Sequence, residues 1–359
     1  MTQLTHKPSP SNGKSPFTYA IPEFPCEQPD DTLRFSEKAL AVANWFPRTP
    51  PTLLSYHIVS VDAPDCSLSC KDGQLTCKSV EGNRQVPLED VGAIIITSFS
   101  ASIHSKLLLE AAKFGIGLVI CENFKPASLV LPANRSTDTL LTRSQAYIPA
   151  QLKKRLWHKT IDAKCMNQFS LAAELAPGDA RLVRLEKLAR GRFPSKEAEC
   201  AKAFWRIYAD HVAETDDFRR GRNEGGVNNL LNYGYAVLLS TILQNLFAVG
   251  LDPTFGIAHV IRENSTPLAY DLMEPFRPCV DWRVAQWVKT HRDTTEWEVT
   301  REFRQWVTGF PLEKVDWFEL NLDIRGVIEG VMRSFRRSLT TATSGPYRPW
   351  TRTLTKWDG

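Results

Sequence analysis

Apolar positions recur at helical spacing through most of the chain beyond residue 142. In the first such stretch, Leu152, Leu156 and Ile161 fall on one face of a helix. Ser195, followed by Glu197 in the first turn, is typical of a helix start. The same reasoning predicts further helices over residues 180–189, 195–213, 228–249, 268–276, 282–291, 298–308 and 321–339.

Residues 52 to about 133 follow a different pattern, in which short strands alternate with turns. The segments LLSYHIVSV, CSLSCKDGQLTCKSV and RQVPLEDVGAIIITS are rich in residues that favour strands. Asp72 and Gly73, between two of these strands, predict a hairpin. A helix over 102–114, ended by Gly115, precedes a buried strand in GIGLVICE and a last short strand in SLVLPA.

These patterns predict an α+β fold, with a small β-rich N-terminal domain followed by a larger all-α domain. The boundaries that we expect are a Pro-rich extension over 1–50, the β-rich domain over 51–135, a linker over 136–150, the helical domain over 151–340 and a basic tail over 341–359. Proline blocks ladder and helix hydrogen bonds, so the extension should be extended, with one short helix near 36–45.

Composition limits the classes of protein to which the chain could belong. The chain has 359 residues, of which 43% are hydrophobic, enough for two cores. A net charge of +4 is compatible with nucleic acid but does not require it. None of the eight cysteines forms a Cys-x-x-Cys pair, so the common zinc spacings are absent. The apolar stretch over 230–249 is interrupted by polar residues, and no signal peptide opens the chain, so we expect a cytoplasmic protein without a membrane partner.

Three residues are candidate metal ligands, namely Glu197, His259 and Glu274. Their spacing alone is weak support, because Glu197 and His259 are 62 positions apart and no general metal motif joins them. Taken singly, a glutamate on a helix is usually a solvated surface residue, and a lone histidine usually packs or caps.

A longer pattern surrounds these residues. It runs through VNNLLNYGY from Val227, GLDP from Gly250, His259, and DLMEPFRP from Asp271, and ends at Asp281. Upstream, EAECAKAFW begins at Glu197, and KRLWHKTIDAKCMNQ opens the helical region. Over roughly 52–339, the chain resembles the CRISPR-associated protein one family, the integrase and endonuclease of spacer acquisition.

The resemblance implies a β-rich N-terminal domain and a helical catalytic domain that binds Mg²⁺ or Mn²⁺ through Glu197, His259 and Glu274. Two carboxylates and one imidazole suit such an ion and leave positions for phosphate oxygens. The implied reaction is a transesterification in which a 3′-hydroxyl joins a spacer fragment to the repeat array. Asp271, one helical turn before Glu274, could share the site, although packing or capping nearby is the simpler interpretation.

The resemblance also implies partners: double-stranded DNA (the prespacer and the repeat array), a second copy of the chain bound through the β-rich domain, and CRISPR-associated protein two. Phosphate contacts need Arg or Lys, although a basic face is often only solvated. Arg277 sits between acidic positions and could pair with one of them instead. The candidate DNA-binding residues are Arg219, Arg220, Arg222, Arg277, Arg333, Arg336 and Arg337.

Two departures from the family pattern leave alternatives open. The segment from Gly191 to Lys196 reads GRFPSK where the family often has a Gly-Asp pair, and the segment before residue 52 has no counterpart. The chain could therefore be a DNA-binding scaffold of the adaptation complex that has lost catalysis. A hydrolase of small phosphate esters is remote, because a His-Asp dyad and a Gly-rich phosphate loop are both missing.

Overall fold

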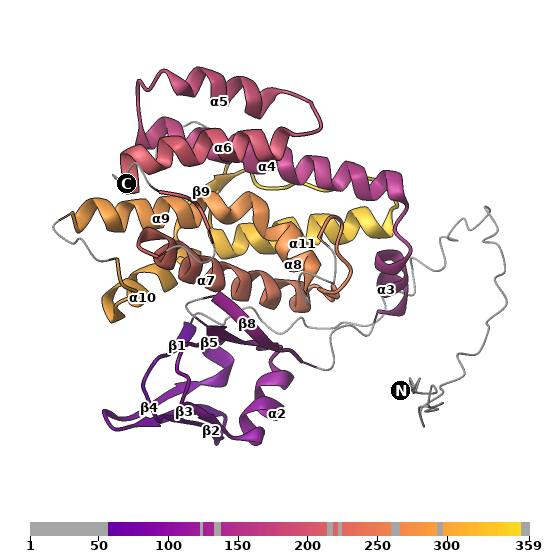
Figure 1. Ribbon diagram of the computed structural model, residues 1–359. Helices are drawn as coiled ribbons and strands as arrows, with labels where there is room; N and C mark the ends of the chain where they lie inside the picture. The colour runs from indigo at the N-terminus through magenta and orange to yellow at the C-terminus, as the bar shows by residue number, and fades with distance from the viewer. Residues whose placement is uncertain are drawn as a thin grey trace, which may run out of the picture. The chain divides into compact units, whose positions relative to one another are not determined.

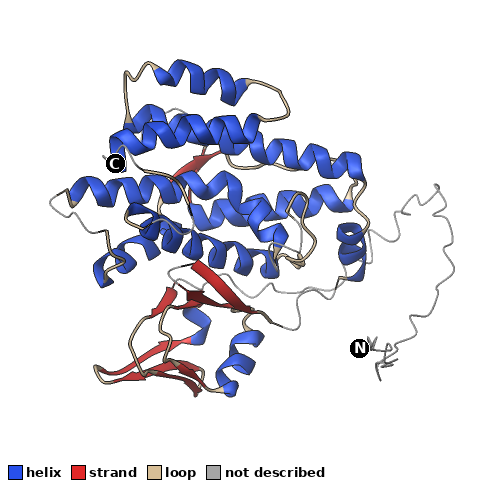
Figure 2. Cartoon of the chain, in the orientation of Figure 1, coloured by secondary structure: helices blue, strands red, loops and turns tan. Residues whose placement is uncertain are grey.

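The computed structural model describes residues 57–122, 125–132, 138–213, 218–221, 225–259, 266–292 and 297–352. The expected N-terminal extension, its short helix and Arg222 lie outside the described residues. Strands gather in the N-terminal part of the described chain, and helices dominate the remainder (Figures 1 and 2). The predicted α+β class, with β structure first and helices after it, is confirmed.

The N-terminal strands form two four-stranded sheets. One has the order β4-β3-β2-β6, with β2 (Ser67–Lys71), β3 (Gln74–Ser79), β4 (Gly82–Pro87) and β6 (Ser102–Ile103). The other has the order β1-β5-β7-β8, with β1 (His57–Val61), β5 (Val91–Ile96), β7 (Leu118–Glu122) and β8 (Lys125–Val130). The predicted hairpin joins β2 to β3, and both Asp72 and Gly73 have the positive φ that a two-residue turn of this kind requires.

Strand β5 is buried along its whole length, which explains its unbroken apolar sequence. Ile94 and Ile96 belong to a core shared with the β2-β3 hairpin and helix α2 (Ser105–Lys113). Ile95, on the opposite face, belongs to the core of the helices. The β1-β5-β7-β8 sheet therefore lies between the two cores.

The helical region is built around α7 (Val227–Ala248), which is buried along nearly its whole length and packs on β5, β7 and β8. Glycines permit the closest approaches: a Cβ at Gly234 would lie 2.5 Å from Val280 Cγ1, and one at Gly92 would lie 2.9 Å from Gln244 Oε1. The other helices are α3 (Thr139–Ala146), α4 (Ala150–Leu175), α5 (Arg181–Arg190), α6 (Lys196–Tyr208), α8 (Pro267–Met273), α9 (Arg277–Thr290), α10 (Arg301–Thr308) and α11 (Ile324–Thr340).

Two predictions about elements are wrong. Residues 321–323 are not the start of a helix, because β9 (Lys314–Trp317) and β10 (Leu320–Asp323) form an antiparallel hairpin. The alternation of KVDWFELNLD fits strands, and α11 starts only where Asp323 accepts a hydrogen bond from the Gly326 N–H at 2.6 Å. The expected linker over 136–150 also contains a helix, α3, capped by Asp138.

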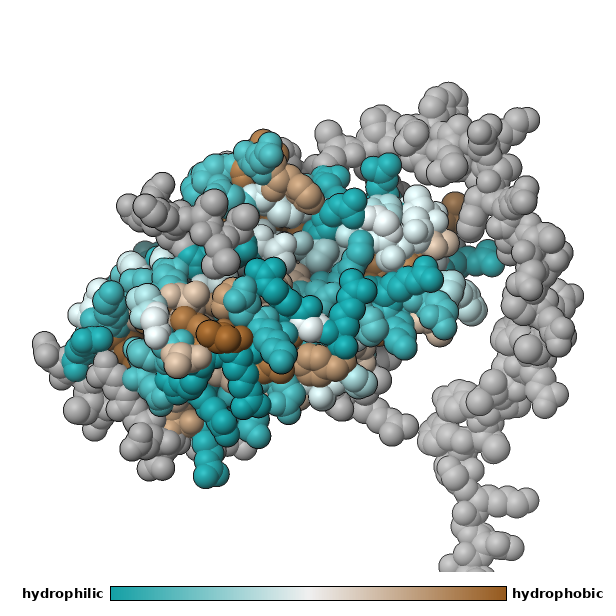
Figure 3. Space-filling model, turned by 90° about the horizontal axis from the view of Figure 1, so that it is seen from above, coloured by the Kyte–Doolittle hydropathy of each residue, from teal (hydrophilic) through white to brown (hydrophobic). Residues whose placement is uncertain are grey.

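In the described part of the chain, no helix has both the length and the apolar character needed to span a bilayer. Viewed from the side of α5 in Figure 1, the molecule presents mostly hydrophilic side chains, with apolar side chains scattered among them (Figure 3).

Candidate functional site

Glu197 lies in the first turn of α6. Two ion pairs link α6 to α4, one with its lysine on α4 and the other with its lysine on α6. Lys164 on α4 donates to Glu197 Oε1 at 2.7 Å. Lys196 on α6 donates back to Asp162 Oδ1 on α4 at 2.5 Å. The Glu197 side chain keeps 40% of its surface exposed, so it borders on solvent.

Glu274 begins the short 3₁₀ helix η3 (Glu274–Phe276) between α8 and α9 and is almost fully buried. Arg277 Nε donates to its Oε1 at 2.8 Å, and Lys164 Nζ lies 2.6 Å from its Oε2. Burial alone would raise the pKa of the Glu274 carboxyl, but the charges of Arg277 and Lys164 lower the pKa to about 2. The carboxylate is therefore ionised at any physiological pH.

Lys164 is the residue that joins the two glutamates, and sequence reasoning missed it. Burial lowers its pKa, but the neighbouring carboxylates of Glu274 and Glu197 outweigh this effect and raise the pKa overall. Its signal was in the sequence: Lys164 lies three positions after Ile161, within the apolar stripe of α4. A lysine at such a position needs a buried partner.

His259 lies in the loop between α7 and α8, where Asp271 holds it. The fully buried carboxylate of Asp271 accepts hydrogen bonds from the backbone N–H groups of Ile257, Ala258 and His259. It also pairs with His259 Nδ1 at 2.8 Å, which raises the pKa of His259 against the opposing effect of burial. Asp271 thus caps the loop, as the simpler interpretation expected.

The loop that carries His259 is also tightly packed. A Cβ at Gly256 would lie 2.7 Å from the His259 carbonyl oxygen and 2.7 Å from Pro267 Cβ. Trp157 on α4 meets the His259 ring edge-on, with the ring centroids 6.0 Å apart. Nδ1 is occupied by Asp271, and no hydrogen bond within the described residues uses Nε2, so His259 presents Nε2 as its open nitrogen.

The three predicted ligands come near one another without forming a closed set. Glu197 and Glu274 contact the same ammonium group, and the charge of Glu274 contributes to the raised pKa of His259. Among the described residues, however, no three His, Cys, Asp or Glu side chains are arranged as metal ligands. The predicted ligand set therefore stays a prediction.

Several of the predicted DNA-binding arginines already have protein partners. Arg277 pairs with Glu274 and lies over the Tyr235 ring, 4.7 Å from its centroid. Arg220 donates to the side chains of Asn228 and Asn232 and lies over the same tyrosine at 5.2 Å. Both arginines are thus part of a polar network around Tyr235.

The network around Tyr235 ends on a buried acid. The Tyr235 hydroxyl donates to Asp281 Oδ1, and the Tyr208 hydroxyl donates to the Asp281 carbonyl at 2.9 Å. Burial raises the pKa of Asp281 to about 7, even though the Tyr235 hydroxyl and the charges of Arg220 and Arg277 oppose the shift. Sequence analysis gave Asp281 only as the end of the longer pattern.

The other arginines lie at the surface. Arg219 is exposed, and Arg333, which pairs with Glu329 at 2.6 Å, lies near Arg336 and Arg337 on α11. Arg336 pairs with Asp138 at 2.9 Å. The three α11 arginines line one small cavity of about 270 Å³. This arrangement fits a solvated basic face as well as a DNA contact.

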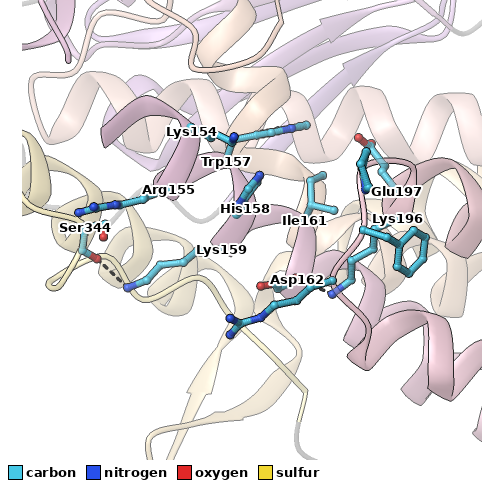
Figure 4. Close-up of a pocket in the computed structure, with 13 residues that line it drawn as sticks. Lys154, Arg155, Trp157, His158, Lys159, Ile161, Asp162, Lys196, Glu197 and Ser344 are labelled. Atoms are coloured by element: carbon cyan, nitrogen blue, oxygen red, sulfur yellow. Dashed lines mark hydrogen bonds and ion pairs between the residues drawn. The ribbon is translucent and has the colours of Figure 1, made fainter. Parts of the chain in front are cut away.

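A larger basic cavity opens beside Glu197 (Figure 4). It has a volume of about 760 Å³, and α4, the α5–α6 connection and Ser344 line it. Trp157 and Phe193 supply aromatic surface, and Arg192 comes from the segment that departs from the family pattern. Its basic side chains are Lys154, Arg155, His158, Lys159, Arg192 and Lys196. Sequence analysis named none of these as a DNA contact, because they converge only when α4 packs on α6.

Comparison with known proteins places the chain in a family. The family model for CRISPR associated protein Cas1 matches residues 59–305, most of the chain. The chain belongs to the Cas1 family. The CRISPR-associated endonuclease Cas1 of Neisseria meningitidis serogroup C (strain 8013) is 33% identical over 224 residues, which are 60% of this chain and 71% of that relative.

Solved Cas1-like structures share the fold. A casposase bound to integration product aligns with a TM-score of 0.67 at 19% identity, over 84% of this chain and 96% of that one. A chain of a Cas6-RT-Cas1–Cas2 complex aligns with a TM-score of 0.68 at 13% identity, over 83% of this chain and 36% of that one. The predicted family, fold class and class of enzyme, a nuclease or integrase, are confirmed.

Proposed function

We propose that this Cas1-family chain is the integrase of CRISPR adaptation and inserts spacer fragments into the repeat array by metal-dependent transesterification. The observation that carries the proposal is the convergence of Glu197 and Glu274, from separate helices, on one cation. Asp271 fixes the orientation of His259, whose raised pKa depends in part on the charge of Glu274.

The donor set suits Mg²⁺ or Mn²⁺ held by Glu197, His259 and Glu274. Two carboxylates and one imidazole are ligands that such ions accept. Glu274 Oε2 is buried and accepts no aligned hydrogen bond within the described residues, although the Lys164 ammonium lies 2.6 Å away as an ion pair. The junction of the carboxylates therefore already accommodates a positive charge.

The residues of the chain have distinct parts in the proposed reaction. Asp271 keeps His259 oriented, as the outer partner of a metal-binding histidine commonly does. The basic cavity beside Glu197 binds backbone phosphates and holds the strand end near the carboxylates. A divalent ion held by Glu197, His259 and Glu274 would supply Lewis-acid polarisation of the scissile phosphate and would favour attack by the 3′-hydroxyl, with one phosphodiester formed as another is broken.

The partners of the proposed integrase are double-stranded DNA, a second copy of the chain and CRISPR-associated protein two. The casposase neighbour is bound to an integration product, and the other solved neighbour is in a complex with Cas2, which supports the DNA and the protein partner. We assign the homodimer surface to the β-rich domain and keep the domain division at 51–135 and 151–340.

The test is strand transfer of a duplex fragment with free 3′-hydroxyls into a repeat-bearing plasmid in Mg²⁺ or Mn²⁺. Glu197→Gln, His259→Ala and Glu274→Gln should each lower the rate by more than about a hundredfold, since each removes a ligand. Glu199→Gln is the matched control, because Glu199 lies on the same helix and its side chain is equally exposed, at 40%. Undiminished joining by His259→Ala would refute the proposal.

The alternative, a catalytically silent DNA-binding scaffold, has one observation in its favour. Lys164 and Arg277 together already balance the charges of the two glutamates, and a site so balanced needs no metal ion to be stable. The scaffold predicts DNA binding that is insensitive to chelators, and no strand transfer in any divalent ion. The same assay, run with EDTA and with a binding measurement in parallel, separates the two functions.

A further inference from the structure

The Lys164 ammonium occupies the position where two like-charged carboxylates meet. Nζ lies 2.7 Å from Glu197 Oε1 and 2.6 Å from Glu274 Oε2, and the lysine side chain is 11% exposed. The two acids come from different elements, the first turn of α6 and the η3 helix. Their common neighbour therefore sets the distance between α6 and η3 at this point.

Among the described residues, neither glutamate pairs with a second cation that also reaches the other glutamate. Arg277 donates to Glu274 Oε1, whereas Lys164 lies against Oε2 of the same carboxylate. Lys196, the residue next to Glu197, is directed to Asp162 on α4. Without Lys164, the partly exposed carboxylate of Glu197 would face the buried carboxylate of Glu274, and the two like charges would repel each other.

We propose that Lys164 is a built-in counter-ion that holds Glu197 and Glu274 together in the metal-free chain and is displaced when the divalent ion binds. This inference rests on the proposed function, because it takes the two glutamates as metal ligands. Lys164 is thus a positioning residue and a competitor of the metal at once. It keeps the site assembled without metal and makes metal binding weaker than the carboxylates alone would allow.

The competition has a measurable consequence. Because Lys164 must leave before the divalent ion binds, its displacement is coupled to metal binding. Coupling of this kind commonly changes an affinity by about fivefold to about 150-fold. Replacing Lys164 by a neutral side chain should therefore tighten metal binding while it destabilises the metal-free protein. A lysine that merely packs, or that helps to hold the ligands around the metal, would give the opposite sign or no change in affinity.

The experiment measures the Mn²⁺ affinity and the thermal midpoint of the full chain, without DNA, for wild type and Lys164→Met. We expect a Kd for Mn²⁺ that is tighter by about tenfold in the variant, within the usual range of such coupling. We also expect a lower Tm in EDTA and a larger rise in Tm with saturating Mn²⁺ than in wild type. If Lys164→Met does not fold, Lys164→Gln, which keeps a hydrogen-bond donor but no charge, replaces it.

Arg283→Met is the matched control. Arg283 is also a cation with little exposure that pairs with one glutamate, Glu313, outside the candidate site. Its loss should lower the Tm by a similar amount with and without Mn²⁺ and leave the Kd unchanged. A variant at Lys164 that behaves like this control would overturn the inference.

The two proposals fail in distinguishable ways. Wild-type protein that binds no Mn²⁺, or binds it equally well after Glu197→Gln, would refute the metal site itself. Wild-type binding that Glu197→Gln weakens, together with equal or weaker binding by Lys164→Met, would refute only the counter-ion. Tighter binding by Lys164→Met with a lower metal-free Tm supports both.

Discussion

The His259 loop and the Glu197–Glu274 junction hold their ionisable side chains in different ways. In the loop, the carboxylate of Asp271 accepts three backbone N–H groups in addition to the pairing with the imidazole. At the junction, one lysine side chain connects two helical elements, and Glu197 remains half-exposed. The loop is thus fixed by many local bonds, whereas the two glutamates are linked through a single lysine side chain.

The loop therefore fixes the orientation of His259, whereas the junction balances the charges of Glu197 and Glu274. A histidine with one nitrogen occupied by a buried carboxylate presents the other nitrogen in one direction before any ligand arrives. Glu274 is also held by Arg277, but Glu197 borders on solvent, and by our proposal its distance from Glu274 depends on which cation lies between them. We infer that the loop is the preorganised half of the site, and that the junction is the half that adjusts.

The largest expected effect comes from removing the acid that fixes the loop. Asp271→Ala leaves three backbone N–H groups and the His259 ring without their acceptor, which should cost about 3 kcal/mol of stability or more. We also expect the Mn²⁺ affinity to fall by about 10-fold to 100-fold, the usual effect of losing the outer partner of a ligand. Calorimetry and hydrogen exchange of the 257–259 amides measure both effects.

Asp323→Ala is the control for this variant. Asp323 caps α11 by accepting from the Gly326 N–H, so its loss should cost about 1 kcal/mol without any change in metal affinity. Slow exchange of the 257–259 amides in Asp271→Ala would mean that packing alone, at Gly256 and Trp157, holds the loop. The contrast between loop and junction would then disappear.

The loop and the junction also differ in how far the sequence predicts them. Glu197, His259 and Glu274 were found through a resemblance, because residues 62 and 15 positions apart carry no periodic signal. Lys164 was missed because its position in the apolar stripe of α4 indicates a buried partner without identifying it, and Glu197 and Glu274 lie far away in the sequence. The simpler interpretation of Asp271, packing or capping nearby, agrees with the hydrogen bonds that it accepts from the 257–259 N–H groups, although its position one turn before Glu274 also allowed a share in the site.

The fold shows a similar limit. Hydrophobic periodicity predicts the long helices, and the Asp72-Gly73 pair predicts the β2–β3 hairpin, because both signals are local. It missed the β9–β10 hairpin, whose turn at Phe318 and Glu319 takes positive φ at two residues without any glycine. The basic cavity, which depends on three separate segments, has no local signal at all.

The second prediction concerns the buried acid behind the junction. The raised pKa of Asp281, about 7, means that the folded state binds a proton more tightly than the unfolded state. The stability that this proton contributes is full below about pH 4 and is lost as the pH rises to about 7. Asp281→Asn should therefore gain about 2 to 3 kcal/mol relative to wild type between pH 5 and pH 8, since one pKa unit is worth about 1.4 kcal/mol.

Urea unfolding of both proteins at these two pH values measures the gain. Asparagine can still accept the Tyr235 hydrogen bond, so the change isolates the charge. Parallel stability curves at pH 5 and pH 8 would show that Asp281 stays ionised, neutralised by Arg220 and Arg277. Arg277 would then be shared between Asp281 and Glu274, and the junction would be held by more than one cation.

The smallest expected effect lies on the open side of the junction, where Glu197 borders the basic cavity. If Lys154 contacts one DNA phosphate there, Lys154→Met should weaken binding of all DNA sequences alike and reduce the slope of log K against log salt by about 1. Lys113→Met, at an exposed position on α2, should leave the slope unchanged. Mn²⁺ affinity and amide exchange in the 257–259 loop should not respond to either variant. A Lys154 variant that disturbs the loop would mean that the two halves of the site are mechanically coupled through α4, which carries both Lys154 and the Trp157 that packs on His259.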